Sequence, residues 1–128
     1  MPRGEHAFQY ALLRLVPDEE RGERFNVGVV MLVRSRDFLG FRAQLDRAKL
    51  SALGPRLDSR EIGEQLSNLR RIADGETGAG LMARLPLHER FHWLTAPSST
   101  VLQPSELHTG LCTDPAMTLG ALFNRLVA

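Results

Sequence analysis

The longest apolar run of the chain spans Phe25–Val33 and has charged residues on both sides. Its length and its valines are typical of a buried strand. Because a strand that is apolar on both faces must be covered on both faces, the other elements are expected to form a sheet around it, with helices or loops above and below. Gly28 lies in the middle of the run, where a glycine indicates a bulge or a close backbone neighbour.

Two further apolar segments predict strands on either side of this run. Residues 8–16 alternate, so that Phe8, Tyr10 and Leu12 share one face and Ala11 and Leu13 share the other. Residues 38–45 predict a third strand, and residues 18–24, which are almost all charged, predict a solvated loop. Since short connections usually join neighbouring elements, the three strands are expected to pair antiparallel.

Capping residues and helical spacing predict the helices. Asp46 is a candidate cap for a short helix that Gly54 closes, and Asp58 opens a capping-box pattern before a longer helix near 58–74. Asp114 before a proline predicts a last helix near 115–127. The resulting fold class is α+β: one domain over residues 1–128, with an antiparallel or mixed sheet of four to five strands and two or three helices.

The segment between these helices has weaker signals. Residues 74–80 contain three glycines but no phosphate-binding pattern, and they predict a loop. The aromatic residues 91–96 predict a fourth strand that Pro97 ends. Residues 98–106 are expected to be mostly loop, with a brief strand at 100–103 at most.

Composition narrows the class of protein. With 43% hydrophobic and 24% charged residues and no apolar stretch near the ~18 residues of a membrane span, the chain is expected to be cytoplasmic and without a membrane role. A formal net charge of +1 argues against binding to nucleic-acid phosphates as the main activity. The single cysteine, Cys112, is interpreted as a core residue rather than a nucleophile. No cofactor is expected.

One motif suggests metal chemistry. His88, Glu89 and His92 match H-E-x-x-H, in which a helix places two histidines one turn apart on zinc. If this segment is a strand, as predicted, the two imidazoles lie about 13 Å apart and cannot share a metal. His108 would be a third ligand only in a different fold. A metal-dependent or nucleic-acid-acting hydrolase that uses His88, His92 and His108 is therefore the alternative and not the leading hypothesis.

Three stretches carry a family resemblance: residues 10–17 (YALLRLVP), residues 21–30 (RGERFNVGVV), and residues 90–97 (RFHWLTAP) followed by 103–112 (QPSELHTGLC). In order and spacing they resemble the bacterial family known as domain of unknown function 3037, and the resemblance covers nearly the whole chain. It implies a genomic neighbour, a HipA-like serine/threonine kinase of the class found in toxin modules. The chain has no kinase motif of its own.

The resemblance leads to a hypothesis of function. The chain is interpreted as a non-enzymatic interaction module for the HipA-like kinase, with homo-oligomers also open. Its candidate partner-binding residues come from the resembling stretches: Arg21, Glu23, Arg24, Asn26, Arg90, His92, Trp93, Gln103, His108 and Thr109. They are expected to form one polar surface. The alternative interpretation is structural, with Asn26, His92 and Thr109 satisfying backbone groups and Trp93 in the core.

Overall fold

The computed structural model, which describes residues 4–98 and 100–128, contains a five-stranded antiparallel sheet and four α-helices in those residues. In chain order the elements are β1 (His6–Leu15), β2 (Phe25–Val33), the 3-10 turn η1 (Arg34–Arg36), β3 (Phe38–Ala43), α1 (Arg47–Leu53), α2 (Ser59–Ala73), the 3-10 turn η2 (Met82–Arg84), α3 (Leu87–Leu94), β4 (Leu102–Pro104), β5 (His108–Cys112) and α4 (Pro115–Leu126). The α+β class is confirmed, with more helices than the two or three expected.

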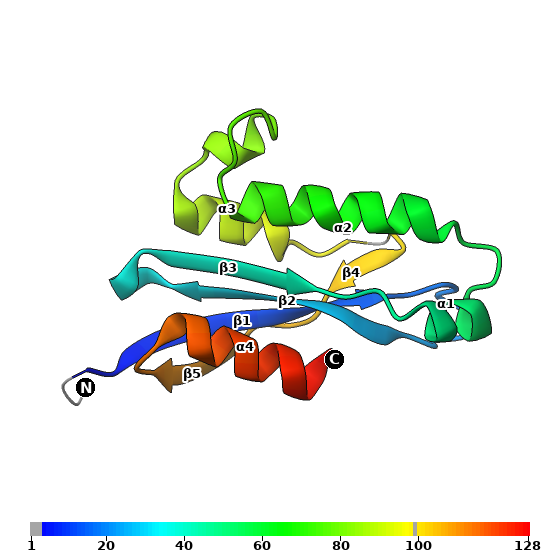
Figure 1. Cartoon of the computed structure of the whole chain (residues 1–128), viewed down its shortest axis with the longest axis horizontal. Coiled ribbons are helices and arrows are strands. Elements are labelled where there is room, and N and C mark those ends of the chain that lie inside the picture. Colours follow the sequence, from blue (N-terminus) through cyan, green and yellow to red (C-terminus); the bar gives the residue numbers. More distant parts are fainter. Residues whose placement is uncertain (1–3, 99) are drawn as a thin grey trace.

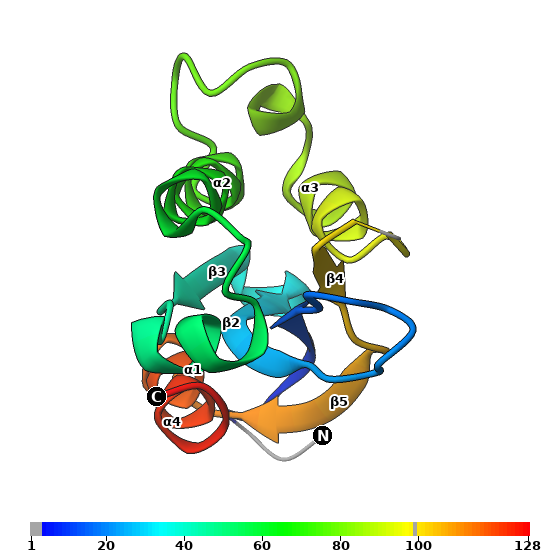
Figure 2. The same ribbon diagram turned by 90° about the vertical axis from the view of Figure 1, so that its right-hand side faces the viewer.

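The sheet separates two helical layers. Figures 1 and 2 show α2 and α3 side by side over one face, and α4 on the opposite face. The strand order is β3-β2-β1-β4, and β5 also pairs with β1, farther along the same edge. The first three strands are thus antiparallel neighbours, as their short connections predicted.

β2 is the buried centre of the fold. Four of the five largest fully buried side chains, Met31, Val27, Val29 and Val33, belong to it. Val30 and Leu32 pack toward the α2–α3 layer. Val29, Met31 and Val33 point the other way and join the core under α4. This confirms the expectation that a strand with two apolar faces is covered on both of them.

A β-bulge accounts for Gly28. The register between β1 and β2 shifts between Leu13 and Arg14, so that Leu13 pairs with Gly28 and Arg14 with Asn26, leaving Val27 as the extra residue. A Cβ on Gly28 would lie 3.3 Å from the carbonyl oxygen of Arg42 on β3. Both reasons for a glycine in a strand interior, a bulge and a close backbone neighbour, therefore apply here.

The helix starts follow their predicted caps. The carboxylate of Asp46 accepts hydrogen bonds from the first turn of α1, and Asp58 and Asp114 do the same for α2 and α4. These bonds satisfy backbone N–H groups that have no partner within a helix. Local sequence was therefore sufficient to place the start of three helices.

The prediction of a strand at residues 91–96 is wrong, because residues 91–94 form the end of helix α3 and Thr95 caps it. Leu87, Phe91 and Leu94 are spaced by four and three residues, which places them on one helix face, and Phe91 and Leu94 are buried against the sheet. The burial of this stripe outweighs the preference of aromatic residues for strands. The hydroxyl of Thr95 ends the helix by donating to the Phe91 carbonyl oxygen at 2.8 Å.

The structure also contains a strand that the pattern did not indicate. β5 (His108–Cys112) is short, polar and glycine-containing, and it forms because β1 extends beyond β4 and offers it a partner. The brief strand expected at 100–103 exists as β4, shifted to Leu102–Pro104. No helix in the described parts of the chain is long and apolar enough to cross a membrane.

Candidate functional site

The candidate residues lie on two sides of the sheet. Arg90, His92 and Trp93 belong to α3, above the face that α2 covers. His108 lies on β5 opposite Tyr10, and Tyr10 packs against the core under α4. The single polar surface expected from the sequence is therefore divided by the sheet.

The α4 side carries the denser group of polar side chains. α4 packs on β2 and β3, while the side chains of β1 and β5 beside it stay partly exposed. We call this region the open face, and its members are Tyr10, Arg14, Arg24, Glu106 and His108. The rings of Tyr10 and His108 are stacked, with centroids 5.0 Å apart and planes inclined by 26°.

Glu106 lies between two basic side chains of the open face. Its carboxylate lies 4.0 Å from Nη1 of Arg14 and 3.5 Å from Nε2 of His108. A hydrogen bond with its own backbone is the main cause that lowers the pKa of the Glu106 carboxyl, and the charges of Arg14, His108 and Arg24 lower that pKa further. The carboxylate thus lies near Arg14 and His108 and is also affected by the charge of Arg24.

A buried serine fixes this arrangement. The hydroxyl of Ser105 accepts from the Leu12 N–H at 2.9 Å and donates to the Glu106 carbonyl oxygen at 2.9 Å, while the Ser105 N–H donates to the Leu12 carbonyl oxygen at 2.7 Å. Ser105 is 7% exposed and is the only buried polar residue among those that the structure describes. It holds the bend between β4 and β5 and so positions Glu106 and His108.

The charged loop before β2 follows the end of β1 that pairs with β4. Gln103 faces Arg14 across the β1–β4 pairing, and its Nε2 donates to Oε1 of Glu19 at 2.8 Å. Within the loop, Nε of Arg21 donates to Oε1 of Glu23 at 2.6 Å. Of the predicted residues, Gln103 is therefore joined to the charged loop that holds Arg21, Glu23 and Arg24. His108 lies farther along β1, opposite Tyr10.

Asn26 has a structural contact. Its Nδ2 donates to the carbonyl oxygen of Leu126 at 2.9 Å and thereby ties β2 to the last turn of α4. That carbonyl oxygen lies at a helix end, where intrahelical partners are missing. For Asn26, the structural interpretation of the sequence pattern is supported.

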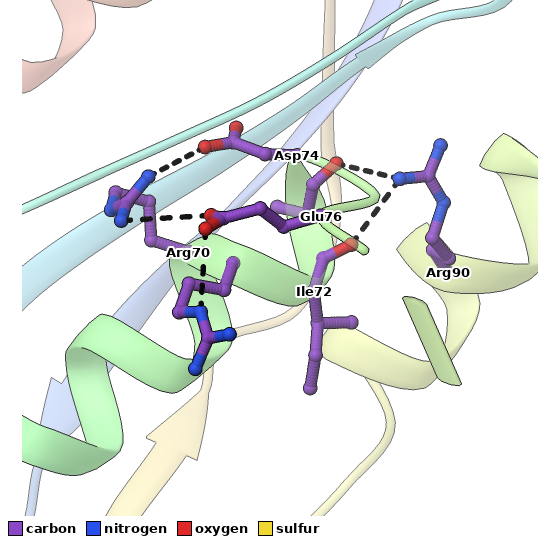
Figure 3. Close-up of polar contacts among 7 residues, drawn as sticks. Arg70, Ile72, Asp74, Glu76 and Arg90 are labelled. Carbon is purple, nitrogen blue, oxygen red and sulfur yellow. Dashed lines mark hydrogen bonds and ion pairs between the residues drawn. The ribbon is translucent and has the colours of Figure 1, made fainter. Parts of the chain in front are cut away.

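Arg90 also holds two elements together. Its Nη1 donates to the carbonyl oxygens of Ile72 at 3.2 Å and Ala73 at 2.9 Å, which are the last carbonyls of α2 (Figure 3). On the other side of the same turn, Arg70 pairs with Asp74 at 2.7 Å. The guanidinium of Arg90 is thus occupied by the end of α2 and does not face the open face.

The histidines of the zinc-like motif meet one geometric requirement and fail another. Because α3 is a helix, His88 and His92 lie one turn apart on its exposed surface, and the separation of about 13 Å inferred for a strand is wrong. His108 lies across the sheet and cannot complete the set. In residues 4–98 and 100–128, no three His, Cys, Asp or Glu side chains come close enough to hold a metal ion.

The remaining candidates are dispersed. Trp93 is 40% exposed and is not a core residue. Thr109 pairs with Gln9, so its side chain is directed to the face opposite that of its neighbour His108. Cys112 is buried, and this burial raises the pKa of its thiol, which lowers the fraction of reactive thiolate.

Sequence reasoning missed Tyr10, Arg14, Ser105 and Glu106. All four lie within the family-like stretches, so their types were visible but their proximity was not. Arg14 offered the clearest signal, because a charged residue inside an otherwise apolar strand needs an exposed position or a partner. Their proximity could not be predicted because strand β5, which brings His108 opposite Tyr10, was not predicted.

Comparison with known proteins gives one match. The family model described as a protein of unknown function (DUF3037) matches residues 10–127, nearly the whole chain. The chain belongs to the DUF3037 family. No curated protein and no solved structure matches it. For this DUF3037 chain, the match covers both the open face and the α2–α3 layer.

Proposed function

We propose that this DUF3037 chain is a bacterial, cytoplasmic interaction module that binds a HipA-like serine/threonine kinase encoded beside it. The partner follows from the family resemblance, and the open face is the binding surface. The observation that carries the proposal is the stacked pair of Tyr10 and His108, which is partly exposed and flanked by charged side chains.

The composition of the open face favours a protein partner. Tyrosine and arginine are enriched among the residues that dominate binding energy, and charged groups around them steer the encounter. The bonds of Ser105 hold the bend of the chain before any partner arrives, which reduces the ordering cost of binding. Stacked rings beside an ion-paired rim fit an interface better than a reaction centre.

The hydrolase alternative needs three histidines that do not lie together in the described residues. His88 and His92 lie on α3, and His108 lies on the other side of the sheet. Hydrolysis assisted by a metal needs its ligands around one ion. No specific observation favours this alternative over the interaction module.

Co-purification with the neighbouring kinase tests the proposal. Because they remove open-face contacts, Arg24→Ala and His108→Ala are expected to weaken recovery of the kinase by roughly tenfold, a loss of about 1.4 kcal/mol. Arg84→Ala and His88→Ala are matched controls, since both residues are exposed on the α2–α3 side. They are expected to bind as wild type does.

Two results would contradict the proposal in different ways. If the wild-type chain does not bind the kinase, the partner is wrong. If wild type binds and both open-face variants bind equally well, the partner is right but the surface is wrong. Thermal unfolding of each variant shows whether a loss of binding reflects a loss of fold.

A further inference from the structure

A cleft on the far side of the sheet has no part in the proposed function. It lies between α2 and α3, above β1 and β4, and has a volume of about 350 Å³. Figure 2 shows the two helices side by side over the sheet, with β4 close to α3. The size is at the lower end of the range for ligand sites, roughly 300 to 1,000 Å³.

The floor of the cleft is apolar. Leu13 from β1, Leu94 from α3 and Leu102 from β4 line it, and all three are buried. Trp93 forms part of the wall and remains 40% exposed, although indole is among the largest apolar groups in proteins. A partly exposed indole beside a buried apolar floor offers a site for an apolar side chain.

The polar groups of the cleft are uncharged. Gln65 and Asn68 lie one turn apart on α2, line the cleft and are exposed. Among the hydrogen bonds of the described residues, neither carboxamide has an intramolecular partner. Each carboxamide can donate and accept, as a peptide group does. No residue that lines the cleft is charged.

From these features we propose that the cleft binds an extended, uncharged peptide segment of a partner protein. An apolar side chain of that segment packs beside Trp93, and its backbone amides bond to Gln65 and Asn68. Charge complementarity supports this class of ligand, because a lining without cations or anions would leave a charged segment unpaired and desolvated. The site is separate from the open face and does not depend on the HipA-like kinase.

The shape of the cleft distinguishes a chain from a small molecule. The cleft is open to solvent and is not an enclosed cavity. Small ligands bury most of their surface in their sites, whereas a peptide can pass through an open cleft and leave the rest of its length outside. A nucleotide is disfavoured because no cation lines the cleft to pair with its phosphates.

Selection from a phage-displayed library of short random peptides, with the intact chain as bait, tests the proposal. Enriched peptides are expected to have an uncharged apolar centre, and their binding should change the fluorescence of Trp93, the single tryptophan of the chain. In titrations with labelled peptide, the double variant Gln65→Ala with Asn68→Ala should bind roughly tenfold more weakly. Glu61→Ala, an exposed change elsewhere on α2, should bind as wild type does.

Three outcomes overturn the proposal: no enriched peptide, enriched peptides with charged centres, or binding that the double variant leaves unchanged. Adenosine serves as a second probe, and saturable adenosine binding without peptide binding would assign the cleft to a nucleobase instead. Arg24→Ala and His108→Ala should leave peptide binding unaltered. A failure of the kinase experiment is therefore distinguishable from a failure here.

Discussion

On the α2–α3 side of the sheet, the guanidinium of Arg90 turns inward and bonds to two backbone carbonyl oxygens. On the α4 side, Arg14 is directed toward a surface carboxylate, Glu106, at 4.0 Å. Both arginines lie in family-like stretches of the sequence. The comparison teaches that membership of a motif does not reveal whether a polar residue holds the fold together or is presented to a partner. Substitutions on the two sides can separate these roles.

The largest effect is expected at Phe91, which anchors α3 and is 2% exposed. Phe91→Ala should reduce the free energy of unfolding by about 3 to 5 kcal/mol, because it leaves a cavity between α3 and the sheet. Urea denaturation measures the loss. Trp93→Ala is the control on the same helix, and since Trp93 is 40% exposed its loss should be clearly smaller. Equal losses would contradict the orientation of α3.

A second test removes the bonds that join α3 to α2. Arg90→Ala should cost about 2 kcal/mol of unfolding free energy, since the carbonyl oxygens of Ile72 and Ala73 each lose a donor. Amide exchange should become faster in the last turn of α2. Arg84→Ala, an exposed arginine nearby, should change neither measurement. If Arg90→Ala changed neither the unfolding free energy nor the amide exchange, Arg90 would again be a candidate for partner contact.

On the other side of the sheet, Ser105→Ala tests the support of the open face. Removing the hydroxyl leaves the Leu12 N–H without its acceptor, and we expect a loss of about 1 kcal/mol in unfolding free energy. Recovery of the kinase should fall as well, because Glu106 and His108 are no longer held in place. Ser98→Ala is the exposed serine control. Stability that falls without any change in kinase binding would argue against the open face as the binding surface.

The smallest effect concerns the pKa of Glu106, which is lowered from its ordinary value of 4.5. A lowered pKa in the folded state means that the carboxylate adds stability above the unfolded pKa, and this contribution is lost as pH falls through the folded pKa. An NMR titration should therefore place the Glu106 midpoint below 4.5, and Arg14→Ala should raise it. A midpoint unaffected by Arg14→Ala would show that their ion pair is not populated.

Sequence alone was sufficient for the first three strands and for helices α1, α2 and α4, and insufficient for residues 87–112. β2, its pairing with β1 and β3, and the caps of α1, α2 and α4 follow from signals within a few residues. For α3, two local signals disagreed, since aromatic content favoured a strand while the spacing of Leu87, Phe91 and Leu94 favoured a helix. Only packing against the sheet decides between them.

The open face depended on contacts between distant residues. His108 meets Tyr10 only because β5 pairs with β1, and nothing in the sequence around His108 indicates that pairing. Ser105 and Leu12, whose backbone and hydroxyl bonds fix the bend, are likewise far apart in the chain. Residue types could therefore suggest candidates, but their division between two sides of the sheet required the fold.

The bend at residues 105–107 has a consequence for the chain at high concentration. It divides the outer edge of the sheet into β4, with three residues, and β5, with five. Long, flat, unpaired edges recruit strands from other molecules and seed fibres, whereas short interrupted edges do not. Pro104 also removes a backbone N–H from this edge. We therefore expect copies of the chain at high concentration not to polymerise through this edge.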